Sequence, residues 1–228
     1  MSLSFPAKVA TGTLVGGTAA AGGLYFHKGT SKPQTHLIKD LLATKHPQKR
    51  LISKSTDGSE AAWRAVWKSY REAYKDKKSN PFSLTSSQLK VEGAEVNAPS
   101  EFRDGCKSIS LERVVDESDE RYQAILSYCT RATLVSDLIS ETAGKTLLQK
   151  GNDFANNQDW KAVWSPYKEA NKGLDQDAWN IGNWSSNKDS INVPEAFVTK
   201  CEEKSKVEEY KLDQPNYLEV LKYCTKSE

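Results

Sequence analysis

Four cysteines carry the most specific chemical signal in this sequence, because their spacing repeats. Cys106 and Cys129 are separated by 23 residues, and so are Cys201 and Cys224. Four cysteines allow three disulfide pairings, and nothing in the spacing resembles the Cys-x-x-Cys of a zinc site. The pattern therefore predicts disulfide bonds. Four buried free thiols in a cytosolic protein are the alternative.

The sequence motifs that would indicate a phosphate loop, a serine nucleophile or a zinc protease are incomplete or missing. The stretch AGKTLL at 143–148 lacks the first glycine of a phosphate loop, because Ile139 stands in that position. Neither Gly-x-Ser-x-Gly nor His-Glu-x-x-His occurs, and the histidines at 27, 36 and 46 all lie in the first fifth of the chain. We therefore predict no catalytic residue, no metal and no cofactor. An enzyme of unknown class is the weakest alternative.

An aromatic phrase occurs twice and reveals an internal repeat. AWRAVWKSYREA starts at 62 and DWKAVWSPYKEA at 159, and YQAILSYCT at 122–130 matches YLEVLKYCT at 217–225. The order and spacing of these matches indicate two tandem, homologous units of about 95 residues. The shared aromatic residues are predicted to form the core of each unit: Trp63, Trp67 and Tyr70 in the first, and Trp160, Trp164 and Tyr167 in the second.

The repeat selects one disulfide pairing. A unit that folds alone must pair its cysteines within itself, so we predict Cys106–Cys129 and Cys201–Cys224. Two antiparallel helices can bring such Cβ atoms to bonding distance. Because disulfides persist outside the reducing cytosol, this pairing places the body of the protein outside the cell membrane.

The apolar periodicity predicts that each unit is mainly α-helical. LIKDLL at 37–42 and LVSDLI at 134–139 each form a helical stripe, and the first aromatic phrase fits one face of a helix over about 59–77. Pro166 is expected to kink the matching helix or to start a new one with Ser165 as its cap. Another helix is expected to begin at Ser100 as its N-cap.

The junction between the units contains neither glycine nor proline from 118 to 142. This predicts a long helix shared by both units, or two abutting helices with a minimal joint. The predicted fold is mainly α: an N-terminal membrane helix followed by two tandem helical repeats that share or abut a junction helix. The predicted domains are an anchor and linker at 1–30, a first repeat at 31–130 and a second at 131–228.

The N-terminal segment differs from the rest of the chain. Residues 9–26, VATGTLVGGTAAAGGLYF, include no charged residue, and as a helix they would span about 27 Å, close to a bilayer core. We predict an uncleaved membrane anchor. A signal peptide cleaved near the alanines at 19–21 and a flexible arm are alternatives. Gly12 and Gly16 form a Gly-x-x-x-Gly that favours weak self-association of such helices.

Charge and surface features narrow the choice of partner. The net charge is only +2, with 32 basic and 30 acidic residues, so nucleic acid is not an expected partner. Trp184 has no aromatic counterpart in the first unit and is a candidate contact for a host or neighbouring protein; packing over its own loop is the alternative. The loops at 78–99 and 173–193 differ most between the units and are expected to carry recognition.

The orientation across the membrane has two interpretations. Lys28, Lys32 and Lys39 follow the apolar segment, while Lys8 precedes it. By the positive-inside rule alone this favours a cytoplasm-facing, membrane-attached scaffold. The paired cysteines favour the opposite orientation, a single N-terminal span with an extracellular body.

The sequence resembles a bacterial protein family. An MS leader with a Gly/Ala-rich apolar segment, followed by tryptophan-rich units that end in SYCT and KYCT, is similar to the paralogous uncharacterised proteins of haemotrophic mycoplasmas. The resemblance covers nearly the whole chain and implies a surface antigen of a wall-less bacterium that lives on red blood cells. It implies no activity, cofactor or catalytic residue. The tandem duplication departs from the single-unit form of that family.

Overall fold

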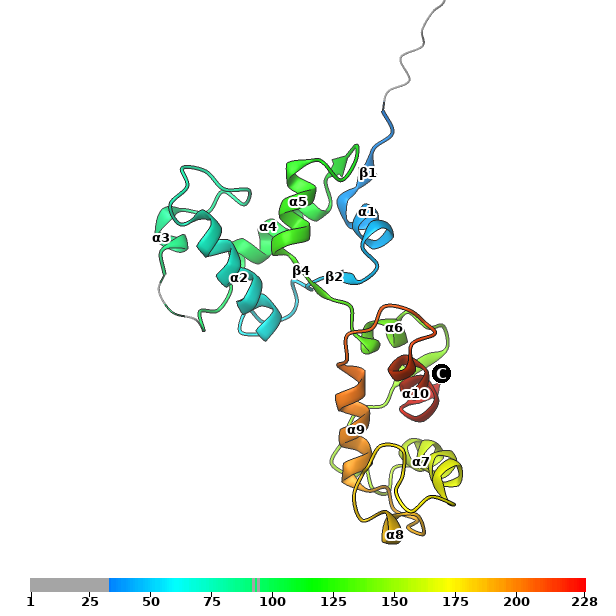
Figure 1. The fold of residues 1–228 in the computed structure, drawn as a ribbon. Coiled ribbons are helices and arrows are strands. Elements are labelled where there is room, and N and C mark those ends of the chain that lie inside the picture. Colours follow the sequence, from blue (N-terminus) through cyan, green and yellow to red (C-terminus); the bar gives the residue numbers. More distant parts are fainter. Residues whose placement is uncertain (1–32, 92, 94) are drawn as a thin grey trace, which may run out of the picture. The chain divides into compact units, whose positions relative to one another are not determined.

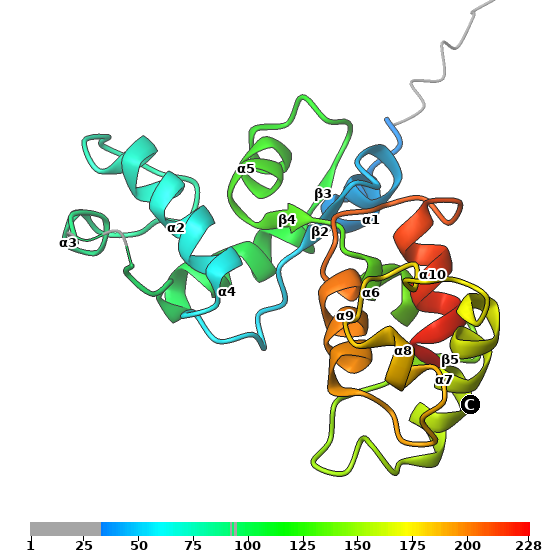
Figure 2. The same cartoon turned by 60° about the horizontal axis from the view of Figure 1, so that its bottom comes forward.

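The structure is a computed structural model that describes residues 33–91, 93 and 95–228 (Figures 1 and 2). Ten helices and six short strands occur in these residues, which confirms the prediction of a mainly α-helical chain. The predicted membrane helix at 9–26, with Gly12 and Gly16, lies outside the described residues. Within them, no helix combines the length and the apolar character that crossing a bilayer requires.

Two hydrophobic cores divide the described chain into unit 1 (residues 33–130) and unit 2 (residues 131–228). Unit 1 contains β1 (His36–Leu37), α1 (Ile38–Lys45), β2 (Lys49–Leu51), α2 (Ala61–Tyr74), α3 (Ser86–Leu89), α4 (Ser100–Ser110), β3 (Arg113–Val114) and α5 (Glu120–Tyr128), and it ends in β4 (Thr130–Ala132). Unit 2 contains α6 (Val135–Ser140), β5 (Lys145–Leu147), α7 (Gln158–Asn171), α8 (Trp184–Asn187), α9 (Glu195–Ser205), α10 (Pro215–Tyr223) and β6 (Thr225–Ser227).

The strands form small antiparallel pairs that close each unit. In unit 1, β2 pairs with β4, and Leu51 lies opposite Thr130. In unit 2, β5 pairs with β6, and Leu147 lies opposite Thr225. A second antiparallel pair joins β1 to β3 in unit 1. Its counterpart in unit 2 is a single bridge between Leu134 and Glu208.

The last helix of each unit organises the other helices. Helix α5 contacts α1, α2 and α4, and α10 contacts α6, α7 and α9. Helix α2 forms because its aromatic residues recur at helical spacing, and the resulting stripe of Trp63, Trp67 and Tyr70 is buried against these neighbours. Packing of this face stabilises the helix more than intrinsic propensity does.

Two disulfide bonds tie the last helix of each unit to the helix before it. Cys106 of α4 is bonded to Cys129, the residue after α5. Cys201 of α9 is bonded to Cys224, the residue after α10. Both bonds span 23 residues with a Cα–Cα distance of 5.6 Å. The prediction of disulfide bonds is confirmed, with each bond inside one unit.

The junction is neither the one long helix nor the two abutting helices that the sequence predicted. Helix α5 ends at Tyr128, and the chain then becomes extended as β4 before α6 begins at Val135. Two contacts set this change of direction. Cys129 is held by its disulfide, and Thr130 is drawn into pairing with Leu51. The absence of glycine and proline did not outweigh these long-range contacts.

The joint between the units is fixed by polar contacts. Thr133 donates its backbone N–H to Gln48 O at 2.9 Å and its hydroxyl to Pro47 O at 2.8 Å. Asp137 accepts the N–H of Leu134 at 2.8 Å and forms an ion pair with Arg131 at 2.6 Å. The carboxylate of Asp137 therefore caps α6 and holds the strand that precedes it.

Two further helix expectations need correction. Helix α7 runs through Pro166 without restarting at Ser165. Pro166 and Ala162, whose carbonyl loses its helical partner, are both solvent-exposed, so water can satisfy that carbonyl. Helix α4 has Pro99 as its N-cap residue, and Ser100 is its first helical residue. Proline fits this position because the extended backbone before a helix matches its fixed φ.

Removing one disulfide tests how much each bond stabilises its unit. The double substitution Cys106→Ser/Cys129→Ser should lower the free energy of unfolding by about 3 kcal/mol, because a bond across a loop of this size restricts the unfolded chain. Urea denaturation measures this, and Cys201→Ser/Cys224→Ser should behave alike. A change below about 0.5 kcal/mol in either pair would contradict the assignment.

The ion pair at the junction predicts a pH dependence. Burial alone would raise the pKa of Asp137, but hydrogen bonds from Arg131 and the Leu134 N–H, with the charge of Arg131, hold it below its ordinary value. The stabilisation is therefore present above the ordinary carboxyl pKa and is lost as the pH falls through the lowered value.

Asp137→Asn should lower the free energy of unfolding by about 2 kcal/mol at pH 7, and this difference should shrink when urea titrations are repeated near pH 3. Asp40→Asn is the matched control at the corresponding helix position, because the Asp40 carboxylate makes no ion pair with the described residues. An equal loss in both variants, or no change with pH, would argue against a capping ion pair.

Candidate functional site

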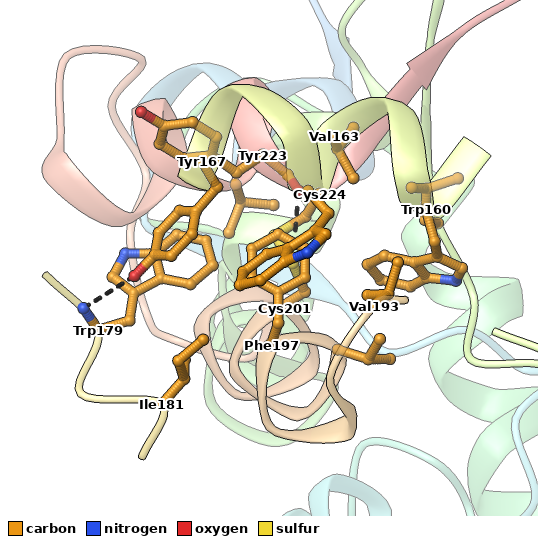
Figure 3. Close-up of a cluster of buried hydrophobic side chains, with 14 of the residues drawn as sticks. Trp160, Val163, Tyr167, Trp179, Ile181, Val193, Phe197, Cys201, Tyr223 and Cys224 are labelled. Atoms are coloured by element: carbon orange, nitrogen blue, oxygen red, sulfur yellow. Dashed lines mark hydrogen bonds between the residues drawn. A yellow bond between two sulfur atoms is a disulfide. The ribbon is translucent and has the colours of Figure 1, made fainter. Parts of the chain in front are cut away.

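A cluster of aromatic rings around one phenylalanine builds the core of unit 2 (Figure 3). The Phe197 ring of α9 lies 4.9 Å from Trp164, 5.1 Å from Tyr167 and 5.5 Å from Trp179, measured between ring centroids. Trp164 and Tyr167 come from α7, whereas Trp179 comes from the loop at 173–193. The cluster therefore fixes this predicted recognition loop against α7 and α9.

A buried carboxylate holds the same loop in place. The hydroxyl of Tyr167 donates to Asp177, and it also accepts the backbone N–H of Trp179 at 3.1 Å. Asp177 accepts two further backbone N–H groups, from Trp179 at 2.9 Å and from Ile181 at 3.0 Å. Burial, and then the hydrogen bond to Asp177, raise the pKa of Tyr167, so this phenol stays a neutral donor.

The loop, α7 and α10 enclose a groove of about 430 Å³. Three aromatic residues contribute to its lining, together with Leu174 and Leu218, which are each 49% exposed. A concave surface with an apolar floor and exposed leucines can bind an apolar group of another molecule. The lining residues are Tyr167, Ala170, Asn171, Leu174, Ala178, Trp179, Leu218, Glu219, Lys222 and Tyr223.

Charged groups at the groove are engaged with its own aromatic residues. Glu219 accepts from the indole N–H of Trp179 at 3.0 Å and from Lys204 Nζ at 2.7 Å. The ammonium of Lys222 lies 4.8 Å from the centroid of the Tyr223 ring. These contacts hold the orientation of the rings, and they place no nucleophile beside a base.

The groove depends on a residue that differs between the units. Asn171 lies at the end of α7, where its amide donates to Tyr167 O at 2.8 Å and its oxygen accepts the Ala178 N–H at 2.9 Å. In unit 1 the corresponding residue is Tyr74, whose ring packs 4.7 Å from Tyr70. The Tyr74 ring also packs 5.7 Å from Tyr128, and a smaller hollow of about 340 Å³ lies beside Tyr74 and Pro81.

The residue that Asn171 contacts, Ala178, also differs between the two units. Ala178 of unit 2 corresponds to Pro81 of unit 1, and proline has no N–H to offer. Each unit therefore contains a matched pair. Tyr74 occurs with Pro81, and Asn171 occurs with Ala178, whose N–H it binds. Sequence comparison of the units could have revealed this pair, but the groove itself required the tertiary structure.

The expectation that Trp184 offers an exposed contact is wrong. Its side chain is only 4% exposed, and its indole N–H donates to Leu174 O at 3.1 Å. Its ring stands edge-on to Trp164, with centroids 6.2 Å apart. Trp184 thus packs over its own loop. This is the alternative that the sequence offered, and it arises because the polar loop folds back onto α7.

The other residues singled out from the sequence lie in two separate cores. The structure buries all six aromatic residues of the repeated phrase, with three in the core of each unit, and each core also contains one disulfide. None of them is an exposed binding residue, although Tyr167 contributes to the groove. In unit 1 the buried aromatics are Trp63, Trp67 and Tyr70; in unit 2 they are Trp160, Trp164 and Tyr167.

Comparison with known proteins adds no assignment. No family model, curated protein or solved structure matches this chain. Among the residues that the structure describes, no group of three or more histidine, cysteine, aspartate or glutamate side chains could hold a metal ion. The interpretation of the groove therefore depends on its own geometry.

The matched pairs predict a specific coupling between two positions. Asn171→Tyr and Ala178→Pro should each destabilise the protein by about 1 kcal/mol, because each removes one partner of the hydrogen bond between them. The double variant, which reproduces Tyr74 and Pro81, should recover about 1 kcal/mol of the summed loss. Urea denaturation of the four proteins measures this coupling. Strict additivity of the two effects would refute it.

Proposed function

We propose that this protein is a membrane-attached, extracytoplasmic surface protein that binds another molecule without catalysis. It would consist of an N-terminal membrane span and two copies of one disulfide-locked helical module. The observation that carries this proposal is the pair of buried disulfides, one in each unit. Disulfides of this structural kind belong to oxidising surroundings, which lie outside the cytosol.

The correspondence of the two units supports a duplicated module. The helices that carry the aromatic phrase, the disulfides and the strand pairs that close each unit all occur in the same order. Backbone hydrogen bonds at corresponding positions also match between the units. Ile52 donates its N–H to Cys129 O at 3.0 Å, and Leu148 donates to Cys224 O at 2.9 Å. Similarity at this level of detail is the expected result of duplication.

The groove of unit 2 supports a binding role. Three of its lining residues come from the loop at 173–193, where the units differ most, and it presents two exposed leucines beside aromatic rings. The occupant would be an apolar group of a host or neighbouring protein. The resemblance to surface proteins of haemotrophic mycoplasmas points to the same class, a surface antigen or host-interaction protein.

A cytoplasm-facing scaffold is the second candidate. The observation that favours it is the charge beside the apolar segment, because Lys28, Lys32 and Lys39 follow it and only Lys8 precedes it. We rank it lower because the reducing cytosol would oppose both disulfides.

Treatment of intact cells with trypsin separates the two candidates. An extracytoplasmic body should be cleaved, because exposed lysines and arginines are spread along both units, whereas a cytoplasmic protein of the same cells should survive as the control. Permeabilised cells show that the protease is active on both proteins. Protection of residues 35–228 in intact cells, together with four titratable thiols in protein isolated without reductant, would favour the scaffold.

A further inference from the structure

A second hollow, unrelated to the groove, lies against the disulfide of unit 1. It measures about 580 Å³, which is within the range of small-molecule sites. Its floor includes apolar side chains, and its edge carries three cationic ones. The lining residues are Leu51, Ile52, Ser53, Lys54, Ser55, Arg103, Cys106, Lys107 and Ser110.

The three cations are only partly neutralised by the protein. Arg103 donates through Nη1 to Lys54 O at 3.3 Å and to Thr56 O at 2.9 Å, while its buried Nε has no hydrogen-bond partner among the described residues. Lys54 forms an ion pair with Asp104, but both side chains are about half exposed, so the pair is weak. Lys107 forms no ion pair with the described residues. Beyond the hydrogen bonds from Ser59, the charge of Arg103 also helps to lower the pKa of the nearby Asp57 carboxyl. Three cations therefore face two carboxylates, Asp57 and Asp104, and the edge carries a net positive charge.

Unit 2 shows that the fold does not require this charge. Helix α9 corresponds to α4 with a constant offset, so Val198 replaces Arg103 and Glu202 replaces Lys107. The disulfide and the strand pair beside the hollow are nevertheless the same in both units. Two cations thus occur in unit 1 at positions where the same architecture accepts an apolar and an acidic residue.

We propose that this hollow binds a phosphate ester carried on an apolar body. Arginine and lysine are the side chains that hold phosphate oxygens best, and Arg103 and Lys107 stand on one helix at the edge of the hollow. The apolar part of the ligand would cover Leu51 and Ile52. A lipid headgroup and a soluble phosphate ester share this chemistry. The proposal depends neither on the groove of unit 2 nor on the side of the membrane.

Calorimetric titration of the full-length protein in a neutral maltoside detergent tests the proposal. The probes are dihexanoylphosphatidic acid, hexyl phosphate, inorganic phosphate and zwitterionic dihexanoylphosphatidylcholine. Dihexanoylphosphatidic acid should bind saturably and at least tenfold more tightly than inorganic phosphate and the zwitterionic lipid. Its affinity should fall with rising salt, because the contact is between charges. Equal binding of hexyl phosphate indicates a soluble ester, and weaker binding indicates a lipid headgroup.

Substitutions that copy unit 2 locate the site. Lys107→Glu should weaken binding of dihexanoylphosphatidic acid at least tenfold while leaving the thermal midpoint unchanged, because unit 2 folds with Glu202 there. Lys107→Gln should have a smaller effect in the same direction. Glu202→Lys is the matched control in unit 2 and should not weaken binding. Absence of saturable binding, equal binding of inorganic phosphate, or unchanged affinity in Lys107→Glu would each overturn the proposal.

Discussion

Each unit depends on one helix that carries a phenylalanine and, four residues later, a cysteine. In α4 these are Phe102 and Cys106, and in α9 they are Phe197 and Cys201. The phenylalanine packs against the aromatic helix, while the cysteine is bonded to the residue that follows the last helix. Residues four apart lie on the same face of a helix. One turn of α4 or α9 therefore holds both the aromatic helix and the last helix of its unit, and the three helices share one core.

The repeated aromatic-Cys-Thr ending acquires a physical meaning from this arrangement. In unit 1, Tyr128 stands edge-on to Tyr70, with ring centroids 5.1 Å apart, Cys129 forms the disulfide, and Thr130 turns the chain into β4. The Thr130 hydroxyl also satisfies Leu126 O at the end of α5, at 2.7 Å. Three consecutive residues thus complete the core, lock it covalently and end the helix, which accounts for their joint occurrence in both units.

The sequence predicted the features that depend on local spacing, and it failed where distant contacts decide. Helical periodicity located the aromatic helices, and equal cysteine spacing gave the pairing found in the structure. The junction was predicted as one helix or two abutting helices because it contains no glycine or proline, yet pairing of Thr130 with Leu51 makes the chain extended. Both hollows join residues far apart in the chain, so no single stretch of sequence could indicate them.

A core of this kind lets each unit change its surface without losing its fold. The disulfide and the phenylalanine contacts involve side chains that are almost fully buried, so substitutions at the edge of the core leave them intact. At corresponding positions unit 2 has Asn171 beside its groove and unit 1 has Tyr74, whereas unit 1 carries Arg103 and Lys107 beside its disulfide. The two units therefore carry hollows with different linings: aromatic rings and exposed leucines in unit 2, and three cationic side chains beside apolar ones in unit 1. One type of core can thus support surfaces of different composition.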